Sequence, residues 1–211
     1  MVSSENTNLW LADALFRLGA VEFGDFTLGR TAVGSPVYLN VRKIIGHPTA
    51  LWRAALVMHE EISALQTMRH PQMDHFDLVA GIPIGGLHIA TAYSLTAKVP
   101  MVYLHPARDG AAAFEGVFEP GQTAIIIDDL VTGGGSIAET AERLRETGLL
   151  VKDAFVLVDR QQGARERLKS VGINLRSALT LEVILNYLMS SGLIEEEWYR
   201  RSLAYLEAGR A

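Results

Sequence analysis

The chain has 211 residues, of which 49% are hydrophobic and 20% are charged. A chain of this length and composition can bury one substantial core and is neither disordered nor fibrous, so we expect a single α/β domain over residues 1–211. Aspartate and glutamate number 24 against 19 lysines and arginines, which gives a net charge of −5. An acidic surface repels nucleic-acid phosphates, so we expect no nucleic-acid partner.

The sequence contains no cysteine and no long apolar segment, which excludes cysteine-dependent sites and membrane-spanning helices. A chain without cysteine has no disulfide, no thiolate nucleophile and no zinc site with cysteine ligands. The first residues lack the basic flank and apolar run of a secretory signal, and no segment approaches the roughly 18 uninterrupted apolar residues of a membrane helix. We therefore expect a cytoplasmic protein that does not associate with membranes.

Apolar periodicity, punctuated by glycine and proline, predicts the elements in chain order. The first third is predicted to contain two helices on either side of an extended stretch: Asn8–Leu18, Phe23–Val41 and Ala50–Met68. The middle is predicted to alternate strands with helices: strand Asp77–Ile82, helix Leu87–Lys98, strands Pro100–Leu104 and Thr123–Ile127, helix Ser136–Thr147 and strand Asp153–Val158. Three helices are predicted to follow: Arg165–Val171, Thr180–Met189 and Glu195–Ala208.

The alternation of strands and helices predicts a mostly parallel sheet with helices on both faces. In such sheets, ligands bind at the carboxyl ends of the strands. We therefore expect the functional site just after four strand ends, namely Ile82, Leu104, Ile127 and Val158.

The strongest motif is the segment Ile125–Ser136, in which an apolar strand leads to two acids, three glycines and the start of a helix. Consecutive glycines let the backbone approach an oxyanion closely, and the helix start adds its positive end. Thr132 and Ser136 add hydroxyl donors, so the segment predicts a monophosphate site. Adjacent carboxylates such as Asp128 and Asp129 repel each other, and a sugar diol beside a magnesium ion would stabilise the pair.

Each half of this motif, taken singly, is weak. Asp128 and Asp129 could simply end a strand, and the glycines could simply form a loose turn. The segment is not a P-loop, because no Gly-Lys-Ser/Thr follows the glycines. It is not the dinucleotide-binding fingerprint either, because there the glycines precede the acid. The combination of strand, acids, glycines and helix start is what makes the phosphate site specific.

Residues Asp128–Ser136 resemble the phosphoribosyl-pyrophosphate (PRPP) motif of the type I phosphoribosyltransferases. Four further segments are similar to the orotate phosphoribosyltransferase branch: Phe23–Leu28, Ser35–Leu39, Val79–Gly86 and Val158–Gly163. The resemblance implies a central, mostly parallel sheet flanked by helices, with a small N-terminal hood. Residues 1–45 and the C-terminal helices would contribute to the hood and its packing.

The resemblance also implies roles for individual residues. Asp128 and Asp129 would hold the ribose hydroxyls and would be catalytic together with Arg108. The 5-phosphate would be bound by Thr132, Gly133, Gly134, Gly135 and Ser136. The pyrophosphate would be bound by Ile84, Gly85, Gly86 and Arg108. The base would be contacted by Arg160, Thr132 and Tyr38.

Arg160 has a chemical reason for its role, because a guanidinium matches a planar carboxylate such as that of orotate. The alternative for Arg160 is a surface salt bridge. Mg²⁺ is the implied cofactor; PRPP would hold most of its coordination near Asp128 and Asp129, with no direct protein ligand. The implied partners are PRPP, a nucleobase and a second copy of the chain in a homodimer.

The sequence departs from the family pattern where the family uses lysines. The family's mobile loop corresponds to His105–Gly116, which contains Arg108 but no lysine. A further family lysine is replaced near Gly29-Arg30-Thr31, where Arg30 is the available cation. The expected activity is transfer of phosphoribosyl from PRPP to orotate. The alternatives are transfer to another nucleobase, or a PRPP-binding regulator with impaired catalysis.

Overall fold

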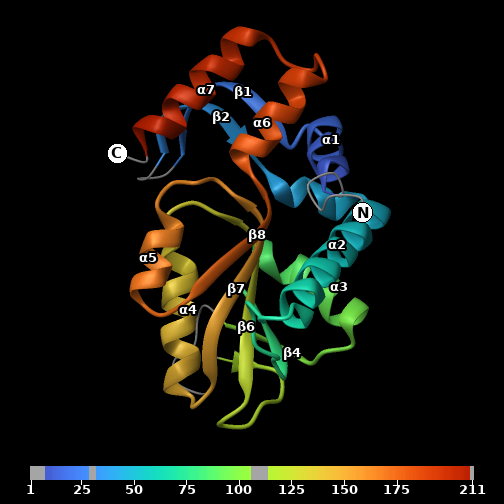
Figure 1. Ribbon diagram of the computed structural model, residues 1–211, viewed down its shortest axis with the longest axis vertical. Coiled ribbons are helices and arrows are strands. Elements are labelled where there is room, and N and C mark those ends of the chain that lie inside the picture. Colours follow the sequence, from blue (N-terminus) through green and yellow to red (C-terminus); the bar gives the residue numbers. More distant parts are fainter. Residues whose placement is uncertain (1–7, 29–31, 106–113, 210–211) are drawn as a thin grey trace.

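The computed structural model describes residues 8–28, 32–105 and 114–209, and the structural statements below concern those residues. They form a six-stranded core sheet with helices on both faces and a smaller hood built on a two-stranded sheet. Figure 1 shows the hood lying above the carboxyl ends of the core strands.

The core sheet has the strand order β5-β4-β3-β6-β7-β8. Its strands are β3 (Leu78–Gly81), β4 (Met101–Leu104), β5 (Phe114–Glu115), β6 (Thr123–Val131), β7 (Leu150–Asp159) and β8 (Asn174–Thr180). All neighbouring pairs are parallel except β4 and β5, which are antiparallel. The expectation of a mostly parallel sheet is confirmed.

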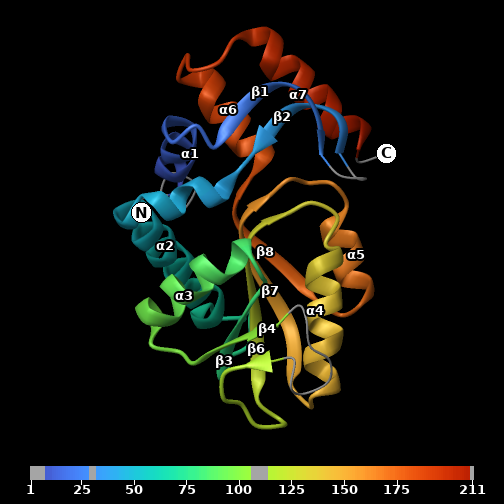
Figure 2. The same ribbon diagram turned by 180° about the vertical axis from the view of Figure 1, so that it is seen from behind.

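Helices cover both faces of this sheet. The four helices of the core are α2 (Pro48–Thr67), α3 (Gly85–Ala97), α4 (Gly135–Glu146) and α5 (Ala164–Ser170). Figures 1 and 2 show α2 and α3 on one face and α4 and α5 on the other. None of the helices in the described ranges combines the length and the apolar character needed to cross a membrane.

The apolar run of β6 is explained by burial on both faces. Ile125 and Ile127 belong to the hydrophobic cluster that includes α2, α3 and the hood, whereas Ile126 belongs to the cluster under α4 and α5. Successive side chains of a strand point to opposite faces, so a central strand with two covered faces has no polar side to present.

The hood combines the beginning and the end of the chain. Its strands β1 (Val21–Leu28) and β2 (Ala32–Leu39) pair antiparallel, and its helices are α1 (Leu9–Arg17), α6 (Leu181–Ser190) and α7 (Glu196–Ala208). A 3₁₀ helix, η2 (Val41–Gly46), leads from β2 to α2. Phe23 of β1 packs against Trp198 of α7, with ring centroids 6.2 Å apart.

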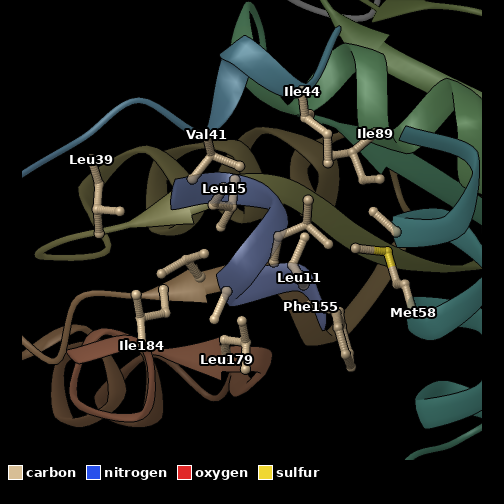
Figure 3. Close-up of a cluster of buried hydrophobic side chains, with 14 of the residues drawn as sticks. Leu11, Leu15, Leu39, Val41, Ile44, Met58, Ile89, Phe155, Leu179 and Ile184 are labelled. Carbon is tan, nitrogen blue, oxygen red and sulfur yellow. The ribbon is translucent and has the colours of Figure 1, made fainter. Parts of the chain in front are cut away.

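One continuous hydrophobic cluster joins the hood to the core. Figure 3 shows Leu11 and Leu15 of α1 between Ile184 of α6 and Ile44 of η2, with Phe155 of β7 nearby. These five side chains are at most 3% exposed. This shared packing fixes the position of the hood above the carboxyl edge of the sheet.

The structure differs from the predicted elements at four points. Strand β8, strand β5 and the helix η2 were not predicted, and β6 extends four residues beyond the predicted strand end at Ile127. β8 is an edge strand whose residues Arg176–Ala178 are only partly buried, so its sequence lacks a long apolar run. β6 is longer because β7 continues to pair with it as far as Val131.

Candidate active site

Two carboxylates lie at the carboxyl edge of the core sheet, where β6 continues past the end of its neighbour β3. β3 ends at Gly81, which is opposite Ile127 of β6. β6 then runs through Asp128 and Asp129 to Val131, paired there with β7. The acids are therefore within the strand, and they lie beside the space that the shorter β3 leaves.

The turn between β3 and α3 occupies that space and approaches both acids. A methyl group placed on Gly85 would lie 2.5 Å from Oδ1 of Asp129, and one placed on Gly86 would lie 2.6 Å from Oδ1 of Asp128. Real Cβ atoms do not come so close to other heavy atoms, so only glycine permits this approach. The side chain of Ile84, by contrast, is 71% exposed. The fold thus brings the predicted pyrophosphate turn and the two predicted ribose-binding acids together.

Asp128 is buried, with only 8% of its surface exposed. Its burial, and secondly the neighbouring charge of Asp129, raise the pKa of the Asp128 carboxyl well above its usual range. The backbone N–H of Asp129 donates a hydrogen bond of 2.9 Å to Oδ1 of Asp128 and partly opposes this effect. A ligand that offers hydroxyl donors or a cation here would favour the ionised pair.

The glycine loop connects β6 directly to α4. Gly134 is the residue before the helix and has a φ of 73°, in the left-handed region that favours glycine. A methyl group on Gly134 would also lie 3.1 Å from Cγ of Leu168 in α5, whereas one on Gly133 would meet no atom within 4 Å. No side chain caps α4, so the first N–H groups of the helix are available to an anion.

Arg160 lies beside this loop, because its backbone N–H donates a hydrogen bond of 3.0 Å to the carbonyl of Val131. Its side chain is 3% exposed. Its Nη2 donates hydrogen bonds to Oγ of Ser35 at 3.1 Å and to the carbonyl of Val37 at 3.4 Å, both on β2. Its Nε has no hydrogen-bond partner, and no carboxylate among the described residues pairs with it.

Arg160 is therefore not a surface salt bridge but a buried cation at the boundary of core and hood. Burial lowers the pKa of its guanidinium. A buried charge without a carboxylate is unfavourable, and an anionic ligand would stabilise it.

The ion pair at this strand end is formed by the preceding residue instead. Asp159 is fully buried and accepts a hydrogen bond of 2.8 Å from Nε of Arg165 and another of 2.8 Å from the backbone N–H of Gln161. The side chain of Gln161 exchanges two hydrogen bonds with Glu182 of α6. The turn that carries Arg160 is thus held from both sides.

A cavity of about 220 Å³ opens in front of the two acids. Its lining includes Asn40, Arg42, Gly85, Asp128, Asp129 and Ser136. None of the motifs found in the sequence includes Asn40 or Arg42. They line the same cavity as the acids because η2 follows β2 out of the hood.

The remaining predicted site residues are not brought together at this cavity. Tyr38 is partly buried on β2, where its ring centroid lies 5.6 Å from that of Phe26. Tyr38, Thr132 and Arg160 do not line the cavity. Arg108 and Arg30 lie outside the described residues.

The donor groups at the acids fit a magnesium ion that is held mainly by a substrate. In the part of the chain that the structure describes, no three His, Cys, Asp or Glu side chains are grouped so that they could hold a metal. Asp128 and Asp129 supply two carboxylates at the cavity. Magnesium keeps several of its waters and commonly binds substrate phosphates, so a diphosphate substrate would hold the ion beside these carboxylates.

Comparisons with known proteins agree with this geometry. Residues 62–178 match the family model described as "Phosphoribosyl transferase domain". The chain is 39% identical to the orotate phosphoribosyltransferase of Cenarchaeum symbiosum over 190 residues, which cover 87% of this chain and 90% of that protein. It is 36% identical to bovine uridine 5'-monophosphate synthase over 93% of this chain and 40% of that protein.

Solved structures show the same fold. The orotate phosphoribosyltransferase of Aeropyrum pernix is 34% identical, with a TM-score of 0.72 over 85% of this chain and 99% of that one. The UMP synthase of Leishmania donovani is 32% identical, with a TM-score of 0.85 over 98% of this chain. This chain spans 44% of the Leishmania chain, so it corresponds to less than half of the longer relatives.

Proposed function

Because this chain belongs to the phosphoribosyltransferase family, and within it to the orotate phosphoribosyltransferases, we propose that it transfers the phosphoribosyl group of PRPP to orotate. The bond from ribose C1 to pyrophosphate breaks, and a bond from C1 to a ring nitrogen of orotate forms while that nitrogen loses its proton. The products are orotidine 5'-monophosphate and pyrophosphate, and the reaction is a pentosyl transfer of pyrimidine biosynthesis.

The observation that carries this proposal is the approach of the Gly85-Gly86 turn to Asp128 and Asp129. It places a turn suited to a pyrophosphate against two carboxylates suited to ribose hydroxyls, with the glycine loop continuing from the same strand. PRPP has these three parts in this order. Binding it across the three features would place ribose C1 next to the cavity.

Catalysis at this site would be mostly positioning and electrostatics. Positive charge develops on the ribose ring as the pyrophosphate departs, and Asp128 and Asp129 would stabilise it. The neighbouring N–H groups of the turn would hold the departing anion. Mg²⁺, when bound with PRPP, would neutralise part of the pyrophosphate charge.

Arg160 is the residue that favours an acidic base. It is a buried cation without a carboxylate, and it adjoins both the glycine loop and β2 of the hood. The carboxylate of orotate would supply the missing negative charge. Thr132 and Tyr38 are proposed to contact the base from either side of this boundary.

The organisation of the protein is also part of the proposal. Residues 1–211 would act as one phosphoribosyltransferase domain, with the hood closing over the base. The chain would function in the cytoplasm as a homodimer. Arg108, in the loop that the family uses to cover the pyrophosphate, would act on the leaving group.

The test is a spectrophotometric assay that follows the loss of orotate in the presence of PRPP and magnesium, run beside adenine, guanine, hypoxanthine and uracil. Transfer to orotate, in preference to the other bases, is the expected result. Transfer only to another base would reassign the base specificity. If calorimetry shows that PRPP binds but no base is converted, the protein is a PRPP-binding protein and the proposed transferase activity is wrong.

A further inference from the structure

We propose that Arg42 holds the pyrophosphate group of PRPP, in the role for which this chain lacks the expected lysines. This assignment rests on the proposed function, because it concerns the same substrate. It adds a residue that the motifs did not indicate.

The position of Arg42 is fixed by the short helix η2. Val41 and Ile44 of this helix are buried, with 2% and 3% of their surfaces exposed, and they anchor it against the hydrophobic cluster shared by the hood and core. Arg42 is exposed and lines the 220 Å³ cavity together with Gly85, Asp128 and Asp129. Arg42 therefore lies on an element anchored by buried side chains, and it lines the cavity together with Gly85 of the predicted pyrophosphate turn.

Arg42 is the only cationic side chain among the described residues that line this cavity. The four lysines of the chain are Lys43, Lys98, Lys152 and Lys169, and none of them lines it. Lys43, the immediate neighbour, instead pairs with Glu22 at 2.8 Å and donates to the carbonyl of Gly19 at 2.6 Å. A pyrophosphate that entered the cavity would meet two carboxylates and one cation.

Arg42 does not neutralise the two carboxylates in this structure. It has no hydrogen bond and no ion pair with any described residue, although Asp128 and Asp129 line the same cavity. An arginine that served to hold the acids would lie within 4 Å of them, as Arg165 does with Asp159. An unpaired guanidinium is free to accept a ligand, and its planar fork of donors matches two phosphate oxygens.

Inorganic pyrophosphate and ribose 5-phosphate are the two probes of this assignment. A contact to the pyrophosphate group affects only the first ligand, whereas a general disturbance of the site weakens the binding of both. Each ligand, and PRPP, is titrated into the full chain with magnesium by calorimetry, for the wild type, Arg42→Ala, Arg42→Lys and Lys43→Ala. Arg42→Ala is expected to weaken pyrophosphate and PRPP by about 10- to 100-fold, the range for hydrogen bonds to charged groups. Ribose 5-phosphate, which lacks the pyrophosphate, is expected to bind unchanged.

The other variants are the controls. Arg42→Lys is expected to restore part of the affinity for pyrophosphate, since it keeps the charge without the fork. Lys43→Ala removes an equal charge one residue away and is expected to bind all three ligands as the wild type does. Unchanged pyrophosphate affinity in Arg42→Ala would overturn the assignment, as would an equal loss for ribose 5-phosphate or an equal effect of Lys43→Ala. If the wild type does not bind PRPP at all, the proposed function itself fails.

Discussion

Arg160, at the end of the core strand β7, donates a hydrogen bond of 3.1 Å to Ser35 of the hood strand β2, which lies 125 residues earlier in the chain. Both side chains are buried, and Oγ of Ser35 in turn donates a hydrogen bond of 2.7 Å to the carbonyl of Val37. The hood therefore orients the cation that we propose for orotate, and the two parts of the protein share one binding residue.

Two neighbouring arginines should respond in opposite ways to replacement by alanine. Arg160→Ala removes a buried cation that lacks a carboxylate, so it is expected to leave the stability of the empty protein unchanged or raised. It should weaken orotate binding by about 1.5–3 kcal/mol and leave PRPP binding unaffected.

Arg165→Ala leaves the fully buried carboxylate of Asp159 without its cation. The expected loss of stability is about 3 kcal/mol, the lower end of the range for buried pairs, because Arg165 is itself half-exposed.

Thermal melts of both variants measure the change in stability, and calorimetry with orotate and with PRPP measures the change in ligand affinity. A large loss of stability in Arg160→Ala, with equal losses for orotate and PRPP, would make Arg160 a structural residue.

Ser35→Ala tests whether the hood positions Arg160. The substitution removes one of the two hydrogen-bond acceptors of Nη2, so the KM for orotate is expected to rise by about 3- to 10-fold while the KM for PRPP stays constant. Ser177→Ala is the matched control, because Oγ of Ser177 accepts a hydrogen bond of 3.2 Å from Arg165 instead. Steady-state kinetics with each substrate varied separately would show the difference. Equal changes in both variants would argue against a specific role of Ser35.

The raised pKa of Asp128 predicts how the stability of the ligand-free protein depends on pH. Because the folded state favours the protonated carboxyl, the stability that this group contributes is full below its unfolded pKa, near 4, and is lost as pH rises through the raised folded value. Asp128→Asn does not titrate. It should therefore melt above the wild type at pH 7, by roughly 2–4 °C for each kcal/mol of relieved penalty in a chain of this size.

The difference between Asp128→Asn and the wild type should shrink towards pH 4, where both side chains are neutral. Thermal melts across this range, without magnesium or PRPP, make the measurement. Asp128→Asn should also bind PRPP more weakly at pH 7, since we propose that the ionised carboxylate accepts hydrogen bonds from the ribose hydroxyls. A melting difference that does not change with pH would mean that ionisation of Asp128 is not its cause.

Alanine substitutions at Gly86, in the Gly85-Gly86 turn at the start of α3, and at Gly133, in the glycine loop before α4, should affect stability differently. Alanine at Gly86 would place its methyl group 2.6 Å from Oδ1 of Asp128 and 2.8 Å from the backbone oxygen of Ile127, so the backbone must shift. Gly86→Ala is expected to cost about 1–3 kcal/mol of stability and to abolish tight PRPP binding. Gly133→Ala meets no atom within 4 Å and should melt like the wild type. Equal melting temperatures for both variants would contradict the close approach of the turn to the acids.

The order of the elements and the acid-rich glycine loop could be predicted from the sequence. The three isoleucines before Asp128 indicate a strand buried on both faces, and glycine next to a helix start indicates an anion site, because these are local properties of periodicity and backbone freedom. The same local reasoning predicts the boundaries of α1, α4 and α7 to within two residues. It cannot predict β8, whose partly polar residues become a strand only by pairing with β7.

The tertiary structure decided which distant residues share the site. The hydrogen bond from Arg160 to Ser35 depends on how the hood packs onto the core. The same packing places Arg42 in the cavity that Asp128 and Asp129 line. That packing comes from the cluster shared by α1, η2, α6 and β7. No short-range pattern encodes contacts between residues so far apart in the chain, because their strength depends on the burial and mutual orientation that folding creates.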